Sequence, residues 1–245
     1  MVNFKIEIAN KVIEVNAFYE STEKYCEGYF SDRQPQYTIT LTKEDLEKER
    51  TTNDNGKVYV SEEISALYRK IANLFVEEDI LVFHGSSFKV GNNAFIVTAH
   101  SGVGKSTHVK LLEQYLGDKF TYINDDKPLL EIKDSGLMIY SSPWNGKERR
   151  GNNSSAPLRS VIFLNRGLTN TYRKIDNKQE VYFRILSQIY LPLDKSKRAK
   201  GLKLIDILLK SVNFYEINVN TDISSAMMTY ERIIKNEIKW KLLNP

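Results

Sequence analysis

The sequence predicts a mixed α/β fold with an added layer of short strands at its N-terminus. In the first sixty residues, apolar and polar side chains alternate with the period of half-buried strands. From residue 61 onward, apolar stripes at helical spacing recur between short apolar runs. Some of these runs are separated by helices and others only by tight turns. That pattern is typical of a sheet with both parallel and antiparallel pairs rather than of a purely parallel sheet.

Length and composition exclude several classes of protein. The chain has 245 residues, of which 41% are hydrophobic and 27% charged, so it is neither disordered nor collagen-like. Its net charge of +4 is too small to predict nucleic-acid binding. Cys26 is the single cysteine, which excludes an intrachain disulfide. No apolar run approaches the roughly 20 residues that cross a bilayer. We therefore expect a cytoplasmic protein without a membrane or nucleic-acid partner, and the sequence leaves a homo-oligomer open.

Residues 1–60 are predicted to form a β-rich subdomain. The charged run 43–50 and the turn 53–56 interrupt the strand pattern at its end. No linker rich in Pro, Gly or Ser follows, so we expect a single domain over 1–245, with its core over 61–245. The alternating segments, each expected to be a strand, are 4–8, 13–17 and 37–41.

The core is predicted to begin with a helix capped by Ser61 and continuing to about Phe75, because Leu67 and Ile71 share one face with Phe75. The basic run 195–200 is interpreted as a solvated connection between helices. Further strands are expected at 80–83, 88–90, 94–98, 120–123, 129–132, 137–140, 161–164 and 214–219. Further helices are expected up to Leu116, where Gly117 ends one, over 181–190, over 202–212, and after the N-cap Asp222.

The most specific signal is the segment Ala99-His-Ser-Gly-Val-Gly-Lys-Ser-Thr107, which lies between an apolar strand and a helix. Glycines allow successive backbone N–H groups to wrap an anion, and the helix N-terminus adds partial positive charge. This is the Walker A pattern of nucleotide-binding loops, with Ala99 in place of the usual first glycine. It predicts Lys105 on the β- and γ-phosphates and the Ser106 hydroxyl on Mg²⁺. The residues assigned to nucleotide binding are Ser101, Gly102, Val103, Gly104, Lys105, Ser106 and Thr107.

An acidic pair, Asp125 and Asp126, follows the strand 120–123, twenty residues after Lys105. Phosphoryl transfer requires Mg²⁺ to offset phosphate charge and a carboxylate to orient or deprotonate the attacking group. Neighbouring side chains diverge in an extended backbone, so one aspartate is expected to face the metal and the other the acceptor. The sequence does not decide which aspartate has which role.

Together these residues resemble the catalytic domain of HPr kinase/phosphorylase and its smaller stand-alone relatives, which share the phosphoenolpyruvate carboxykinase-like P-loop fold. The resemblance rests on His84-Gly85 ahead of a strand, on the Ser-Gly-Val-Gly-Lys-Ser loop and on the Asp-Asp pair. It covers roughly residues 80–165 and, more weakly, the C-terminal part. The sequence Pro143-Trp-Asn-Gly-Lys-Glu148 is similar to the stand-alone members in particular. The chain has no segment like the Leu-Val-Asp-Val-Arg stretch that the family uses with its carrier protein.

The resemblance implies a mixed-sheet core of the phosphoenolpyruvate carboxykinase/HPr kinase type, Mg-ATP bound at the loop, and transfer of the γ-phosphate to a hydroxyl. In the type family the acceptor is a serine of a carrier protein. Carried onto this chain, Asp125 and Asp126 become metal ligand and general base, and His84 a polar group that orients one of them. The implied catalytic set is Asp125, Asp126, His84 and Lys105, and the implied metal ligands are Ser106, Asp125 and Asp126.

Basic residues supply further candidates for contacts with phosphate or substrate. Lys147, Arg149 and Arg150 lie in a loop rich in glycine and asparagine, and Arg166 follows the strand 161–164. The planar guanidinium of arginine binds phosphate oxygens through two hydrogen bonds, which suits it to charge that develops during transfer. Trp144 is better explained by packing of this loop onto the body than by stacking on adenine.

We therefore predict an ATP- and Mg²⁺-dependent kinase that phosphorylates a hydroxyl on a protein, a peptide or a small molecule. One alternative is a non-catalytic ATP-binding regulatory module, which the degenerate Ala99 weakly allows and the complete Gly-Lys-Ser motif with both acids opposes. Another alternative is a decarboxylating phosphotransferase, but the histidine and lysine metal ligands of that class are not evident. The sequence is silent on the acceptor, on the reverse reaction and on phosphate donors other than ATP.

Overall fold

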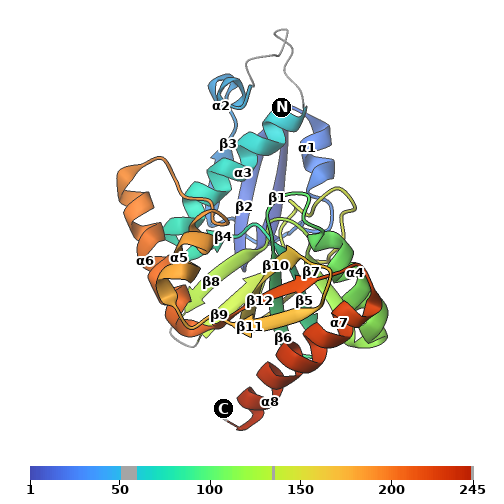
Figure 1. The fold of residues 1–245 in the computed structure, drawn as a ribbon. Coiled ribbons are helices and arrows are strands. Elements are labelled where there is room, and N and C mark those ends of the chain that lie inside the picture. The colour runs from blue at the N-terminus through green and yellow to red at the C-terminus, as the bar shows by residue number, and fades with distance from the viewer. Residues whose placement is uncertain (51–59, 134–135, 244–245) are drawn as a thin grey trace.

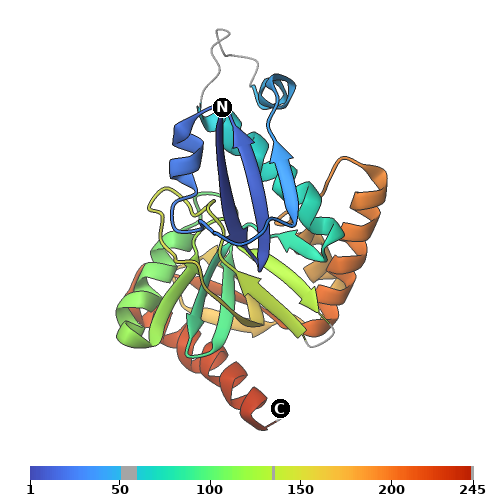
Figure 2. The ribbon, with the colours of Figure 1, turned by 180° about the vertical axis from the view of Figure 1, so that it is seen from behind.

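The structure, a computed structural model, describes residues 1–50, 60–133 and 136–243. Among these residues, a three-stranded sheet near the N-terminus lies against a nine-stranded mixed sheet. Figure 1 shows the small sheet with helix α3 above the large sheet, and Figure 2 shows its strands from behind. The prediction of a mixed α/β fold with an N-terminal strand layer is confirmed.

The N-terminal layer is built on a hairpin of β1 (Val2–Ile8) and β2 (Lys11–Ala17). Its two-residue turn, Ala9-Asn10, has φ of 49° and 60°, the left-handed geometry that matches the twist of paired strands. Strand β3 (Tyr37–Thr40) then pairs in parallel with β2. Two short helices complete the layer, α1 (Glu20–Tyr25) and α2 (Lys43–Lys48).

Two sequence interpretations in this layer need correction. The charged run 43–50 is mostly helix α2, because the Thr42 side chain caps it and the Asp45 carboxylate accepts a hydrogen bond from the Thr42 N–H, which completes a capping box. Helix α1 was not predicted, because its six residues carry only one buried side chain, that of Thr22. The predicted turn at 53–56 lies outside the described residues.

The large sheet is organised by its longest strand, β10. Its first residues, from Ser155, pair antiparallel with β9; it then pairs in parallel with β6 from Leu158 and with β12 from Ser160. The strand order is β4-β8-β9-β10-β6-β5-β7, with β12 on β10 and β11 on β12. The strands are β4 (Ile80–Val82), β5 (Ser86–Val90), β6 (Asn93–Thr98), β7 (Phe120–Asn124), β8 (Leu129–Lys133), β9 (Gly136–Tyr140), β10 (Ser155–Arg166), β11 (Thr171–Lys174) and β12 (Asn213–Val219).

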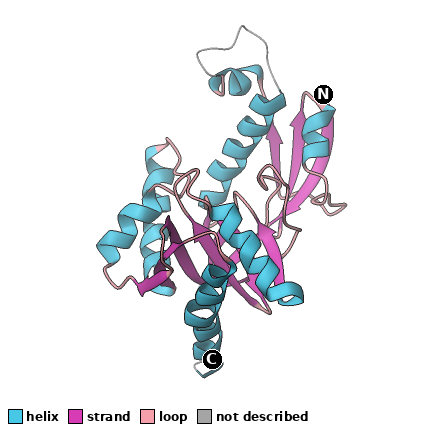
Figure 3. Cartoon of the chain, turned by 45° about the vertical axis from the view of Figure 1, so that its right-hand side comes forward, coloured by secondary structure: helices cyan, strands magenta, loops and turns pink. Residues whose placement is uncertain are grey.

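Helices cover both faces of this sheet, as Figure 3 shows. Ser61 is the second residue of α3 rather than its cap, and the basic run 195–200 opens helix α6 instead of forming a connection, because Asp194 caps that helix. Asp222 caps α7 as predicted. The helices are α3 (Val60–Glu77), α4 (Lys105–Leu116), η1 (Gly117–Lys119), α5 (Lys178–Leu186), α6 (Lys195–Ser211), α7 (Ile223–Thr229), the π-helical turn η2 (Tyr230–Ile234) and α8 (Lys235–Leu243).

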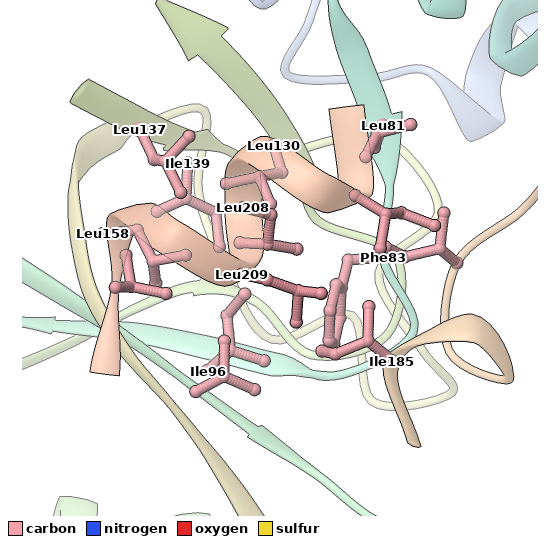
Figure 4. Packing of buried hydrophobic residues seen from close by; sticks show 14 of the residues in the cluster. Leu81, Phe83, Ile96, Leu130, Leu137, Ile139, Leu158, Ile185, Leu208 and Leu209 are labelled. Atoms are coloured by element: carbon pink, nitrogen blue, oxygen red, sulfur yellow. The ribbon is translucent and has the colours of Figure 1, made fainter. Parts of the chain in front are cut away.

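The hydrophobic packing follows the alternation of side chains along the strands. In β6, Ile96 packs with Leu208 and Leu209 of α6, whereas Phe95 and Val97 pack on the opposite face with α4 and α7. Figure 4 shows the α6 leucines against the sheet residues. A third cluster runs from the N-terminal layer across α3 to Val82 and Trp144 of the core. Within the described part of the chain, no helix is long and apolar enough to span a bilayer.

Candidate phosphate-loop site

The sheet topology brings the candidate residues to one end of the large sheet. Strand β5 pairs antiparallel with both β6 and β7, so β6 and β7 point the same way, and β10 is parallel to β6. The C-terminal ends of β6, β7 and β10 therefore lie at the same end of the sheet, where β5 begins. The segments after β6 and β7 carry the glycine-rich loop and the acidic pair, Arg166 is the last residue of β10, and His84 lies two residues before the start of β5.

The loop 99–107 has the backbone geometry that the motif predicts. Gly102 and Gly104 have φ of 78° and 113°, values that side-chain-bearing residues rarely adopt. Gly104 is also the N-cap of α4, and it has no side chain to occupy the first N–H groups of the helix. Those donors, at Lys105, Ser106 and Thr107, belong to residues that line a cleft of about 590 Å³. The loop can therefore bind an anion through its main chain.

Lys105 is directed toward the acidic pair. Its ammonium Nζ donates to the backbone oxygen of Asp125 at 3.0 Å and lies 3.9 Å from the Asp125 carboxylate oxygen Oδ1. Its side chain is only 15% exposed, and this burial lowers its pKa, against the opposing charges of Asp125 and Asp126. A mostly desolvated lysine in this position gains the most from a bound polyanion, because its charge is only partly compensated.

Asp125 is held rigidly and is buried. Its carboxylate Oδ1 accepts from the Ser86 hydroxyl at 2.5 Å, and its backbone N–H donates to Oδ1 of Asn145 at 2.6 Å. Gly151 lies against the same corner, since an added Cβ there would come within 2.5 Å of Asn145 Nδ2 and of the Ile123 carbonyl oxygen. Only glycine fits this close approach, and it fixes the second loop, 145–151, against β7.

Asp126 is the more open of the two acids, with its side chain 35% exposed. Its carboxylate oxygen Oδ1 lies 3.4 Å from Nε2 of His84 and 3.5 Å from Nζ of Lys127. Partial burial opposes ionisation of Asp126, but the His84 hydrogen bond and the charge of Lys127 outweigh it, so the pKa of Asp126 is lowered. Asp126 is therefore an accessible carboxylate that stays ionised at neutral pH.

The structure separates the four basic candidates. Lys147 and Arg166 line the cleft, and Nη2 of Arg166 lies 3.5 Å from the Gly102 carbonyl oxygen. Arg150 instead pairs with Glu148 at 2.6 Å and Glu113 at 2.8 Å. Arg149 donates to the Tyr25 backbone oxygen at 2.6 Å, and its guanidinium stacks over the Tyr25 ring at 4.6 Å. Arg149 and Arg150 are therefore not brought to the cleft in this structure.

Several residues at the site were not singled out from the sequence. His100 and Glu148 line the cleft, and Ser86 and Asn145 hold Asp125. Asn124 accepts from the N–H groups of Asp126 and Lys127, which shapes the turn that carries the acidic pair. An asparagine before two aspartates is a recognisable turn signal, whereas the role of Ser86 depends on a strand pairing that the sequence does not show. Trp144 is buried against Tyr68, which agrees with the predicted packing role.

Comparisons with known proteins give little beyond this geometry. No family model matches the chain, and no curated protein does. Among solved structures, the chain is similar to the HPr(Ser) kinase/phosphatase of Coxiella burnetii, with a TM-score of 0.40 and 10% sequence identity. The match covers 66% of this chain and 94% of that chain. So remote a likeness assigns neither family nor function, which must be argued from the residues of this chain.

Proposed function

We propose that the protein is an ATP-dependent kinase that transfers the γ-phosphate to a hydroxyl group. One observation carries the proposal: a glycine-built anion loop, a desolvated lysine and an accessible carboxylate line the same cleft. The cleft is large enough for a nucleotide triphosphate tail, and its donors and acceptors have the complementary charges that phosphoryl transfer needs. The fold of the HPr kinase type, expected from the sequence, belongs to this proposal.

The residues present fit a magnesium ion as well as ATP. Mg²⁺ prefers oxygen ligands and is usually held by one or two carboxylates together with substrate phosphates. Ser106, Asp125 and Asp126 offer a hydroxyl and two carboxylates around the cleft. Asp125 is the better candidate for a metal ligand, because it lies next to Lys105 of the loop that would hold the phosphates. When bound, the ion would offset negative charge on the phosphate oxygens.

The protein groups have separate tasks in the proposed reaction. The loop N–H groups and Lys105 hold the β- and γ-phosphates, and Arg166 approaches from the end of β10. Asp126 accepts the proton of the acceptor hydroxyl, whose oxygen forms a bond to the γ-phosphorus while the bond from phosphorus to the bridging oxygen breaks and ADP leaves. His84 positions the Asp126 carboxylate and keeps it ionised.

A transfer assay with γ-labelled ATP, Mg²⁺ and hydroxyl acceptors tests this proposal. We expect nucleotide binding by calorimetry and label transfer by the unmodified protein. The double variant Asp125→Asn with Asp126→Asn should retain folded structure by circular dichroism and lose transfer. Transfer that survives in the double variant would exclude the mechanism, and an absence of Mg-ATP binding by the unmodified protein would exclude the function. Binding without any phosphate transfer would favour the regulatory module instead.

A further inference from the structure

A second cavity, of about 480 Å³, adjoins the nucleotide cleft. The two cavities share Asp126, Gly146 and Lys147 in their linings. Asp126 therefore faces a space on each side, one bounded by the phosphate loop and the other by the N-terminal layer. A base in a two-substrate transfer needs this position, because it must reach the acceptor hydroxyl while the phosphate lies across from it.

The second cavity is lined by helix α3, by the end of helix α1 in the N-terminal layer, and by the loops that carry Asp126 and Trp144. Tyr25 ends helix α1, and Ser65, Tyr68 and Arg69 lie on α3. Tyr68 packs edge-on against Trp144 with ring centroids 5.4 Å apart, and Trp144 donates to the Ile64 carbonyl oxygen at 3.3 Å. The Tyr25 ring is held by a cation–π contact with the Arg149 guanidinium. The walls are therefore aromatic and fixed, which suits a preformed pocket.

Two of the three cations that line the pocket are already paired. Arg69 pairs with Glu49 at 2.5 Å, and Lys127 lies 3.5 Å from Asp126. Among the described residues Lys147 makes no ion pair, and it lines both cavities. The lining thus combines three aromatic rings, those of Tyr25, Tyr68 and Trp144, with these cations, and one carboxylate lies at the junction. It offers apolar contact to the body of an acceptor and a proton acceptor to its hydroxyl.

We propose that this pocket is the acceptor site, and that it takes a compact alcohol with an aromatic or aliphatic body rather than the face of a folded protein. The inference rests on the proposed kinase function and adds the substrate class and a role for the N-terminal layer. A volume of about 480 Å³ lies in the range of small-molecule sites, which is roughly 300–1,000 Å³. A folded partner needs a broad contact surface of about 800 Å² on each side instead.

Ser65 allows this pocket to be filled after the protein has folded. The variant Ser65→Cys places a thiol in the pocket wall, and alkylation with N-phenylmaleimide would occupy the space. The natural Cys26 is fully buried, and burial raises its pKa to about 12, so it should not react under the same conditions. Ser211→Cys is the matched control, because both serine hydroxyls donate to the carbonyl oxygen four residues earlier in their helix. Ser211 lies at the end of α6 and lines neither cavity.

The assay measures transfer from γ-labelled ATP to N-acetyl-tyrosinamide, N-acetyl-serinamide, 2-phenylethanol and the flexible peptide N-acetyl-Gly-Ser-Gly-amide. We expect transfer to at least one of the three single-unit alcohols. Alkylated Ser65→Cys should lose at least tenfold in that transfer and keep its Mg-ATP dissociation constant within twofold, and alkylated Ser211→Cys should change neither. Tyr68→Leu, which removes one aromatic wall, should raise KM for the alcohol more than it lowers kcat.

The outcomes separate this inference from the proposed function. Undiminished transfer by alkylated Ser65→Cys overturns the pocket assignment and leaves the kinase function standing. Mg-ATP binding with transfer to none of the single-unit alcohols, or only to the peptide, overturns the compact-alcohol class. Failure of the unmodified protein to bind Mg-ATP defeats the proposed function, and the acceptor site with it.

Discussion

Two loops meet at the candidate site and contribute to it in opposite ways. The loop 99–107 presents its own groups to the cleft: glycines expose main-chain donors, and Lys105 is directed inward. The loop 145–151 contains three cationic residues, Lys147, Arg149 and Arg150. Arg149, however, donates a hydrogen bond to the Tyr25 backbone oxygen, and Arg150 forms ion pairs with Glu113 and Glu148. Its main contribution is structural, since Asn145 fixes the backbone of Asp125.

This difference shows that a loop contributes to a site through the groups that it directs into the cleft, and not through the number of charges that it carries. A cation paired with surface carboxylates offers little to a phosphate, because binding the phosphate must first break those pairs. A backbone donor at a helix N-terminus has no competing partner within its own helix.

The largest effect is expected at the junction between the loops. Asp126→Asn removes the proposed base while leaving a side chain of the same size, so transfer should fall by about 10²- to 10⁴-fold. Mg-ATP affinity, measured by calorimetry, should change by less than a few-fold, because Asp126 faces the acceptor in the proposed mechanism. Asp206→Asn, an exposed carboxamide substitution on α6, is the control. Equal loss of binding and transfer would instead place Asp126 on the nucleotide side.

Lys105→Ala should cause the next largest change. Loss of a charge-assisted contact to phosphate oxygens in a desolvated position is expected to weaken Mg-ATP binding by about 100-fold, equivalent to about 3 kcal/mol. Lys110→Ala is a matched control on the same helix, because the Lys110 ammonium forms an ion pair with Glu148 at 2.6 Å. If both variants bound nucleotide equally well, the loop 99–107 would not be the phosphate site.

The pH dependence of the reaction should reveal the link between His84 and Asp126. The proposed base works as a carboxylate. The transfer rate should therefore be highest above the pKa of Asp126 and should fall as the pH is lowered through that pKa. In the folded protein that pKa is lowered below its usual 3.8, with the His84 hydrogen bond as its main favourable cause. His84→Ala should therefore move the acid limb to higher pH.

Carbon NMR of the Asp126 carboxyl gives a readout of this shift that is independent of activity. The titration midpoint should rise in His84→Ala and stay unchanged in His100→Ala, since His100 lines the cleft but has no hydrogen bond or ion pair with Asp126 among the described residues. An unchanged Asp126 titration in His84→Ala would show that His84 has no influence on the carboxylate.

The sequence predicts the backbone geometry of the loop 99–107 well because the information for it is local. Gly102 and Gly104 are needed for their own backbone angles, and Lys105 follows them directly, so spacing alone suggests the geometry. The acidic pair is similarly marked by its place after a strand. The strands of the N-terminal layer, the mixed sheet and the N-cap at Asp222 also follow from local patterns.

The remainder depends on contacts between distant segments. Ser86 reaches Asp125 only because β5 lies between β6 and β7, and no periodicity within 86–90 reports that order. The basic run 195–200 has the composition of a solvated loop, but the cap at Asp194 and the leucine stripe beyond it extend α6 through it. Arg149 and Arg150 were assigned to phosphate by charge, whereas their partners Tyr25 and Glu113 come from other parts of the chain.

The smallest effects are expected from substitutions of Arg166 and Arg150. These two substitutions compare the two loops most directly, because Arg166 lies beside the loop 99–107 and Arg150 lies in the loop 145–151. Arg166→Ala should weaken Mg-ATP binding by about tenfold, because its guanidinium lies beside Gly102 in the cleft lining. Arg150→Ala should change affinity by less than about twofold, since an exposed pair network contributes only about 0–1 kcal/mol and Arg150 itself does not line the cleft. Calorimetric titration of both variants with Mg-ATP measures the difference. A reversed order, with Arg150→Ala the weaker binder, would mean that Arg150 leaves Glu113 and Glu148 when nucleotide binds, and that the loop 145–151 is itself part of the phosphate site.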